Sequence, residues 1–205
     1  MSWKCQCCGQ ETDGIPICFG SAAPWELFVP DEEFATRVLL DDSCMVIDHE
    51  KHFVRGEIEI PVHGLAMPFR YSVWASVSEE SMNHMFDRWE DQDRANDAPY
   101  FGWLLTSLPL YPDTMHLKLS IQSREVGIVP VFTIEPSEHP LALEQKLGIT
   151  VERWHQIARH VSELAANPPL IPPPAIPERW LCRSCGEMCE PVDVNSWSCD
   201  ARRPW

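Results

Sequence analysis

The sequence predicts an α+β fold, with a mainly antiparallel sheet of about five strands, two or three packed helices and an added zinc-knuckle or ribbon element. Three observations lead to this prediction. Apolar and polar residues alternate in several runs between residues 44 and 134, as they do in half-buried strands. Other segments repeat their apolar residues at helical spacing. A Cys-x-x-Cys-Gly motif stands near each end of the chain.

The alternating runs predict the strands of the sheet. They are residues 44–48, 53–60, 69–77, 114–122 and 128–134. Short connections between the first three favour an antiparallel meander with one solvated face. Pro130 indicates that the last strand is an edge strand or contains a bulge, because proline cannot donate to a strand ladder.

The helical segments follow recognisable start and stop signals. A first helix begins after Ser78, and we assign its apolar stripe to the core: Met82, Met85, Phe86 and Trp89. Residues 137–147 predict a second helix that ends at Gly148. A third begins at Thr150, and one side of it is apolar: Val151, Trp154, Ile157, Ala158, Val161 and Leu164.

Composition divides the chain into four parts. We expect an N-terminal Cys knuckle at 1–20, an α+β core domain at 21–166, a proline-rich linker at 167–177 and a Cys-rich tail at 178–205. The linker has six prolines in eleven residues. It is therefore expected to be an extended spacer of roughly 3 Å per residue.

The two Cys-x-x-Cys-Gly motifs, at residues 5–9 and 182–186, each follow an aromatic residue and one spacer. Two thiolates at this spacing form half of a tetrahedral zinc site. We therefore predict one structural Zn²⁺ shared by Cys5, Cys8, Cys182 and Cys185. Four thiolates leave no open position for water, so such a site would stabilise the fold rather than catalyse a reaction.

Other uses of the cysteines stay open. In one, Cys189 or Cys199 completes a site within the tail, and the first pair binds with Cys18 or Cys44; in another, no metal is bound. A redox role is disfavoured, because neither pair opens a predicted helix and acidic surroundings raise a thiol pKa. We interpret Cys7, Cys18 and Cys44 as buried small residues rather than nucleophiles.

The net charge of −15, from 16 Lys and Arg against 31 Asp and Glu, limits the partners. Such a surface repels nucleic acid and anionic membranes, and a basic protein partner suits it better, although acidity also serves solubility. The sequence has no apolar run of about 18 residues and no export signal at its start, which favours a cytoplasmic location.

Aromatic residues beside two prolines give the remaining candidate site. Such residues can line a groove for a partner peptide or small ligand, or they can fill the core: Tyr100, Phe101, Trp103 and Tyr111. An alternative function is an enzyme whose site lies near this stretch and uses His116 or His139 to carry protons. His139, before Pro140, is better suited to a hydrogen bond at a helix start.

Several phrases of the sequence occur in a recognisable order: Cys5-x-x-Cys8-Gly9, Gly14 to Pro16, Cys44 with Val46-Ile-Asp48, Phe53-Val-Arg-Gly56, Trp74 to Glu79, Tyr100-Phe-Gly-Trp103, Leu108 to Thr114, His139 to Ala142, Gln145 and Gly148-Ile149. In this order they resemble a bacterial family, domain of unknown function 2199. Members of that family often carry His at the position of Thr12. The resemblance implies no catalytic residues, because the family has no assigned activity.

The sequence thus predicts an acidic, zinc-binding cytoplasmic protein that acts as a non-enzymatic protein-binding module. An immunity or antitoxin-like role is one version of this function. Arg55 and Arg70, which lie within predicted strands, are expected to pair with the many carboxylates rather than with a substrate.

Overall fold

The computed structural model describes residues 2–4, 11–13, 18–166, 180–181 and 188–189. Contacts divide the chain into two units, Met1–Pro168 and Pro169–Trp205. The first contains one eight-stranded sheet with the order β3-β7-β8-β9-β10-β6-β5-β4. Its strands are β3 (Cys18–Gly20), β4 (Val38–Leu40), β5 (Cys44–Ile47), β6 (Lys51–Ile60), β7 (Phe69–Val77), β8 (Tyr100–Leu104), β9 (Lys118–Gln122) and β10 (Val131–Ile134).

Helices accompany this sheet, so the predicted α+β class is confirmed. The α-helices of the described residues are α1 (Phe34–Arg37), α2 (Glu79–Asp87), α3 (Pro140–Leu147) and α4 (Val151–Ala166). Short 3-10 turns lie at η1 (Pro24–Leu27), η2 (Asp31–Glu33) and η3 (Arg94–Asn96).

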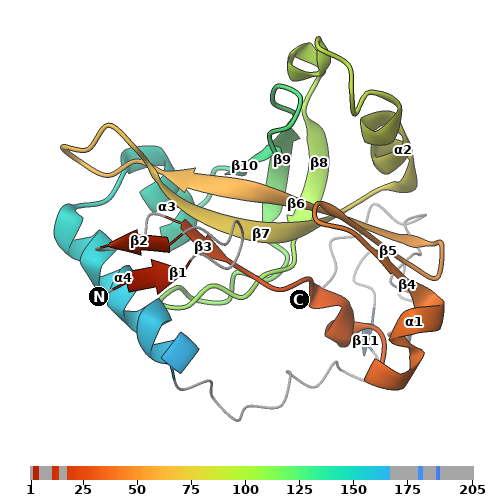
Figure 1. Cartoon of the computed structure of the whole chain (residues 1–205), viewed down its shortest axis with the longest axis horizontal. Helices are drawn as coiled ribbons and strands as arrows, with labels where there is room; N and C mark the ends of the chain where they lie inside the picture. The colour runs from red at the N-terminus through yellow and green to blue at the C-terminus, as the bar shows by residue number, and fades with distance from the viewer. Residues whose placement is uncertain (1, 5–10, 14–17, 167–179, 182–187, 190–205) are drawn as a thin grey trace. The chain divides into compact units, whose positions relative to one another are not determined.

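Five strands of the sheet close into a barrel (Figure 1). Strands β7, β8, β9, β10 and β6 are neighbours in that order, and β6 also pairs with β7 along nine residues. The closing pair, β10 with β6, is parallel, and so is β3 with β7, whereas the other pairings of this sheet are antiparallel. The prediction of a mainly antiparallel sheet of about five strands was therefore incomplete: the sheet has eight strands, and five of them close into a barrel. Alternation within a strand does not reveal which distant strand it pairs with.

Two glycines make this closure possible. A Cβ added at Gly56 of β6 would lie 2.3 Å from the Phe132 ring and 2.7 Å from the Pro130 carbonyl oxygen. A Cβ at Gly102 of β8 would lie 2.7 Å from the Ser76 carbonyl oxygen on β7. At both places the backbones approach more closely than any other side chain allows.

A side-chain amide completes the edge of β10. β10 pairs with β6 at one position, Val131 opposite Glu57. The backbone groups of the later β10 residues on this edge therefore need other partners. Gln145 of α3 supplies them, since its Oε1 accepts from the Ile134 amide at 2.9 Å and its Nε2 donates to the Phe132 carbonyl at 2.7 Å. Thus α3 is fixed to the barrel by hydrogen bonds as well as by packing.

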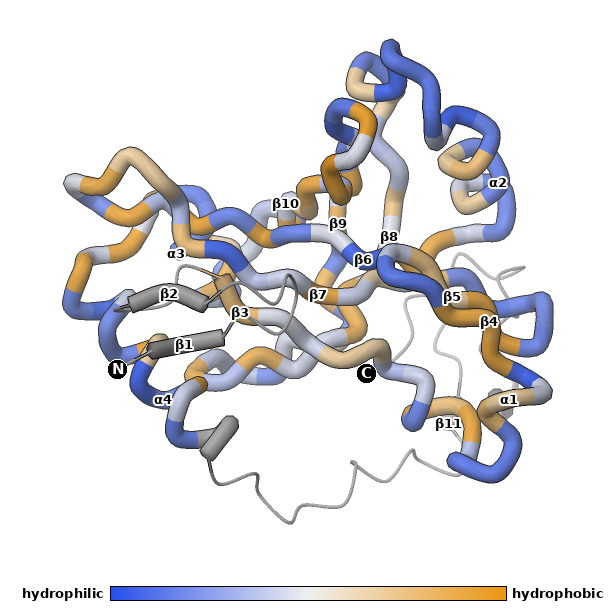
Figure 2. The backbone as a smooth tube through the Cα atoms, in the orientation of Figure 1, coloured by the Kyte–Doolittle hydropathy of each residue, from blue (hydrophilic) through white to orange (hydrophobic). Residues whose placement is uncertain are grey.

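The main core fills the barrel and extends to the helices that cover it. Alternate residues of β6 and β7 point inward, and Figure 2 shows the corresponding alternation of hydropathy along these strands. Met82 and Met85 of α2, Leu141 of α3 and Ile157 of α4 belong to the same core. A second core lies on the opposite face of β5, β6 and β7, where Phe53 and Trp74 pack with residues from 23 to 38.

The helix signals in the sequence are largely confirmed. Ser78 caps α2, with its side chain accepting from the Ser81 amide at 3.1 Å. His139 caps α3 through Nδ1, which accepts from the Leu141 amide at 3.2 Å, as the sequence suggested. Gly148 follows α3 with a φ of 80°, where a Cβ would meet the His63 ring.

Strand boundaries are less well predicted than the strands themselves. Residues 114–117 and 128–130 lie in loops before β9 and β10, and Pro130 stands just outside its strand. β8 was not predicted as a strand, because its sequence Tyr-Phe-Gly-Trp-Leu is apolar on both faces apart from the glycine. No helix among the described residues is long and apolar enough to cross a membrane.

A pair of short antiparallel strands flanks each cysteine motif. β1 (Ser2–Lys4) pairs antiparallel with β2 (Glu11–Asp13), and in the second unit β11 (Trp180–Leu181) pairs antiparallel with β12 (Met188–Cys189). Cys5 and Cys8 belong to the segment between the first two strands, and Cys182 and Cys185 to the segment between the second two. All four predicted metal ligands lie outside the described residues.

Candidate functional site

The four aromatic residues of the candidate groove lie in three different surroundings. Tyr100 packs against the main core, and its hydroxyl lies 2.8 Å from Nδ1 of His84 on α2. Phe101 and Trp103 occupy the alternate positions of β8 and face outward. Tyr111 lies in the loop after β8, beside helices α3 and α4. The structure therefore brings together only Phe101 and Trp103.

Exposed Phe101 and half-buried Trp103 form an aromatic pair beside Lys118 of β9. Their ring centroids are 5.1 Å apart, and the Phe101 side chain is 45% exposed. The Lys118 ammonium lies 6.0 Å from the Phe101 ring and 5.8 Å from the Trp103 ring, and 3.6 Å from a carboxylate oxygen of Glu135. These contacts order the pair while leaving it accessible from solvent. We call these three residues the β8–β9 aromatic face.

Tyr111 belongs instead to a partly buried polar network. Its hydroxyl donates to Glu144 Oε2 at 2.5 Å, and Arg153 Nε donates to Glu144 Oε1 at 2.8 Å. The Tyr71 ring lies 6.2 Å away, and its buried hydroxyl has no hydrogen-bond partner among the described groups. Burial raises the pKa of Tyr71 and of Tyr111 well above the usual tyrosine range. Both phenols therefore stay protonated, and the Tyr111 hydroxyl holds its loop against α3 through Glu144.

The two histidines of the predicted enzyme alternative lie in structural positions. His139 uses Nδ1 to cap α3, while its Nε2 is buried without a hydrogen-bond partner among the described groups. His116 has a φ of 63°, and its amide donates to the Leu104 carbonyl. In the described residues the His139 ring makes no hydrogen bond to a carboxylate.

The Cys44 thiol of β5 is a poor nucleophile. Cys18 and Cys44 form no disulfide, and Cys44 is 6% exposed. Desolvation, with a smaller contribution from the Asp41 charge, raises the pKa of the Cys44 thiol to about 12. Among the described residues no group of three His, Cys, Asp or Glu side chains is arranged to hold a metal ion.

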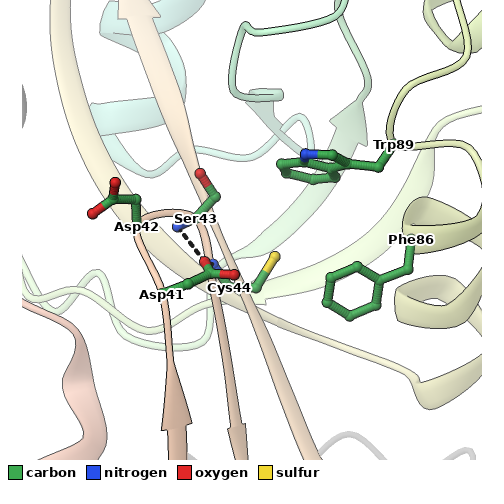
Figure 3. Close-up of a pocket in the computed structure, with 6 residues that line it drawn as sticks. All are labelled: Asp41, Asp42, Ser43, Cys44, Phe86 and Trp89. Atoms are coloured by element: carbon green, nitrogen blue, oxygen red, sulfur yellow. Dashed lines mark hydrogen bonds between the residues drawn. The ribbon is translucent and has the colours of Figure 1, made fainter.

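A pocket that the sequence did not predict lies between the start of β5 and the end of α2 (Figure 3). Its volume is about 470 Å³, and it is lined by Asp41, Asp42, Ser43, Cys44, Phe86 and Trp89. We call it the acid–aromatic pocket. The prediction that Phe86 belongs to the core was wrong, since 46% of it is exposed, and Trp89 lies two residues beyond the end of α2. In the sequence, this pocket is marked only by two adjacent aspartates before a strand. They do not indicate a pocket until the fold places the end of α2 opposite them.

Arg94 fixes the loop that carries Trp89. This arginine is 5% exposed, and its guanidinium donates to four backbone carbonyls, those of Trp89, Arg124, Glu125 and Ile128, at 2.7–2.9 Å. It also lies 5.0 Å from the centroid of the Trp89 ring. The pocket wall is therefore held by a buried and fully bonded side chain.

Glu57 and Glu59 on the outward face of β6 form ion pairs with arginines of neighbouring segments. Arg70 lies 3.3 Å from Glu59, and Arg124 contacts Glu57 at 2.6 Å and Glu59 at 3.0 Å. The prediction that Arg70 pairs with carboxylates is confirmed. Arg55, on the same face, has a buried Nε that makes no hydrogen bond to the described groups.

Comparison with known proteins identifies the family. The model of an uncharacterised protein family conserved in bacteria, DUF2199, matches residues 4–149. Searches of curated proteins and of solved structures gave no match. The matched segment contains the barrel, α2, α3, the aromatic face and the acid–aromatic pocket. The chain therefore belongs to the DUF2199 family.

Proposed function

We propose that the protein is a non-enzymatic, acidic cytoplasmic module that binds a basic protein partner, and that a structural Zn²⁺ stabilises its two cysteine motifs. An immunity or antitoxin-like protein would fit this description. The two parts of the proposal rest on different observations and are tested separately.

The observation that supports the zinc site is the repeated hairpin. Both Cys-x-x-Cys motifs lie in segments flanked by short antiparallel strands, with Trp3 in the first strand of one hairpin and Trp180 in the first strand of the other. A cysteine pair in the turn of a short hairpin is typical of half of a structural zinc site. Cys5, Cys8, Cys182 and Cys185 supply the four sulfur ligands that Zn²⁺ prefers. The metal would stabilise segments with little core of their own.

The observation that carries the binding function is the β8–β9 aromatic face. Phe101 and Trp103 alternate with the core-facing residues of β8, so the barrel does not require their side chains for its packing. Large aromatic side chains are enriched where proteins bind one another and often supply most of the binding energy. Phe101 is exposed and Trp103 half-buried on the outer face of β8, and two adjacent aromatic rings at a surface suit contact with a partner.

The overall charge indicates the kind of partner. At −15, the protein attracts a basic protein over a distance of about one Debye length, roughly 8 Å at physiological salt, and repels other polyanions. Such electrostatic steering mainly raises the association rate constant. Added salt should therefore lower the association rate constant more than it raises the dissociation rate constant. The enzyme alternative is less well supported, because the ring of His139 is already used as a helix cap and the Cys44 thiol is protonated at neutral pH.

Affinity capture from the source organism tests the binding function. The immobilised full chain should retain a basic protein, and Phe101→Ala with Trp103→Ala should abolish its retention. Thr133→Ala, an exposed substitution on the neighbouring strand β10, is the control and should retain it. The unfolding free energy of the double variant should stay close to that of the parent, which separates lost contact from lost folding. Capture that is unaffected by both aromatic substitutions would refute the assignment of this face.

A further inference from the structure

The acid–aromatic pocket, for which no ligand is assigned, has the chemistry of a cation-binding site. We propose that it receives one arginine side chain of the basic partner. The inference rests on the proposed function for the identity of the partner, but the pocket itself can be tested with a small molecule. It is carried by three features of the pocket: a carboxylate, two aromatic rings and a buried thiol.

The carboxylate is that of Asp41. Its Oδ1 accepts from the amides of Ser43 at 2.7 Å and Cys44 at 2.6 Å, which fixes the orientation of the group. Both bonds fall on one oxygen, so Oδ2 is left to accept from a ligand. In Figure 3 the Asp41 carboxylate points to the side where the rings lie, whereas the Asp42 carboxylate points away from them. Asp41 is therefore the direct partner of a bound cation, and Asp42 contributes only at longer range.

The rings are those of Phe86 and Trp89, from the end of α2 and the residues after it. Their centroids are 6.4 Å apart and their planes are inclined by 46°, so the rings form two walls of an open corner. Aromatic faces attract organic cations within about 6 Å of the ring centroid. A guanidinium combines this stacking with hydrogen bonds to a carboxylate, which an ammonium does less well.

The buried thiol lies at the floor. Cys44 is 6% exposed, its Sγ points toward the rings in Figure 3, and no described group bonds to it. A protonated thiol offers a soft, neutral surface to the aliphatic part of an arginine side chain. It does not make a metal site, because no third ligand joins Cys44 and Asp41 among the described residues and because its pKa is raised. The neutral floor and charged rim match an amphipathic side chain.

One neighbouring charge opposes the binding. The Arg94 guanidinium lies over the Trp89 ring and weakens its attraction for a second cation. Four carbonyl oxygens surround Arg94 and partly offset its charge. Phe86 has no such neighbour among the described cations and is 46% exposed. The main attraction is therefore expected from Asp41 and Phe86, with Trp89 as the second wall.

Titration of the full chain with N-acetylarginine methylamide tests the pocket directly. The readout is the indole N–H signal of Trp89 in a nitrogen–proton NMR spectrum, identified by its loss in Trp89→Phe. The signal should shift saturably, with an affinity in the millimolar range that is usual for one side chain. The neutral isostere N-acetylcitrulline methylamide should cause no comparable shift, and N-acetyllysine methylamide should bind more weakly.

Two substitutions of equal charge provide the matched comparison. Asp41→Asn keeps the Oδ1 acceptor of the turn but removes the charge, and should weaken arginine binding roughly tenfold. Asp42→Asn removes the same charge and should change the affinity much less. Equal effects of the two variants, or equal shifts with the citrulline compound, would overturn the assignment. If the parent protein does not bind the arginine compound but still captures its partner through Phe101 and Trp103, the pocket assignment is rejected and the proposed function stands.

Discussion

Gly56 decides whether the barrel can close. A methyl group there would overlap the Phe132 ring of β10 and crowd the Pro130 carbonyl, to which the Glu57 amide donates. Gly56→Ala is expected to lower the unfolding free energy by about 1–3 kcal/mol, the usual cost of overpacking. Chemical denaturation of the variant measures this loss.

A second substitution shows whether crowding is the cause. In the double variant Gly56→Ala with Phe132→Leu, the smaller side chain relieves the ring contact, so the combined loss should be smaller than the sum of the single losses. Strict additivity would mean that β10 does not approach Gly56 as described.

At the residue scale, the sequence contains Gly56 and Phe86 but does not show what each of them contacts. Gly56 stood within the phrase Phe-Val-Arg-Gly and gave no indication of the strand that would cross it. Phe86 shared a helical stripe with Met82 and Met85, yet only the two methionines are buried. The spacing of apolar residues predicts which side of a helix is buried. Whether a residue at the margin of that side is buried depends on what packs against it.

At the level of elements, α3 closes the edge that β10 leaves open. Replacement of Gln145 by Leu removes partners from two backbone groups, those of Ile134 and Phe132. An unsatisfied backbone group costs about 1–3 kcal/mol, so Gln145→Leu should destabilise the protein by at least about 2 kcal/mol in thermal or chemical unfolding. Gln156→Leu on the exposed side of α4 is the control and should change stability by less than about 0.5 kcal/mol. A Gln145→Leu protein as stable as this control would contradict the role of the amide.

The loop before β9 is tied to α3 and α4 through Tyr111, which makes the fold sensitive to alkaline pH. Burial raises the pKa of Tyr71, Tyr100 and Tyr111, the three tyrosines of the chain, above the unfolded value of about 10. Because the folded pKa values are raised, this contribution to stability is fully present below about pH 10 and is lost as the pH rises above it. Phenolate absorbance should therefore develop late and together with the loss of circular dichroism.

A free tyrosine derivative, titrated in parallel, gives the reference curve for this measurement. Tyr111→Phe should lower stability at neutral pH, since it removes the bond to Glu144, and should make the alkaline loss of stability less steep. Three phenols that titrate near the free value while the native dichroism persists would show that the tyrosines are not buried as described.

Elements were predictable from the sequence to the extent that they are local. The alternation of β6 and β7, the Ser78 cap and the amphipathic side of α4 each depend on a few neighbouring residues, and each is present in the structure. β8 and the parallel pairing of β10 with β6 depend on distant segments, so the closed barrel was not predictable from these patterns. The acid–aromatic pocket was missed for the same reason, because Asp41 and Trp89 meet only in the folded chain.

At the scale of the whole molecule, the net charge of −15 and the exposed aromatic side chains both support binding to a basic protein. Among the described residues, burial keeps the Cys44 thiol protonated, the His139 ring caps α3 and Arg124 is ion-paired, whereas Phe86 and Phe101 are exposed. The exposed aromatic side chains support the binding function proposed above. In the proposal above, a structural zinc ion stabilises the segments that contain the cysteine motifs.

The metal content of the purified full chain tests the central proposal most directly. Elemental analysis should find one equivalent of zinc per chain, and Cys5→Ser and Cys182→Ser should each remove most of it, since each deletes one sulfur of a shared site. Chelation of the parent protein should lower its resistance to proteolysis at both cysteine motifs. A metal-free parent would contradict the proposal, as would a Cys5→Ser protein that keeps its full zinc content.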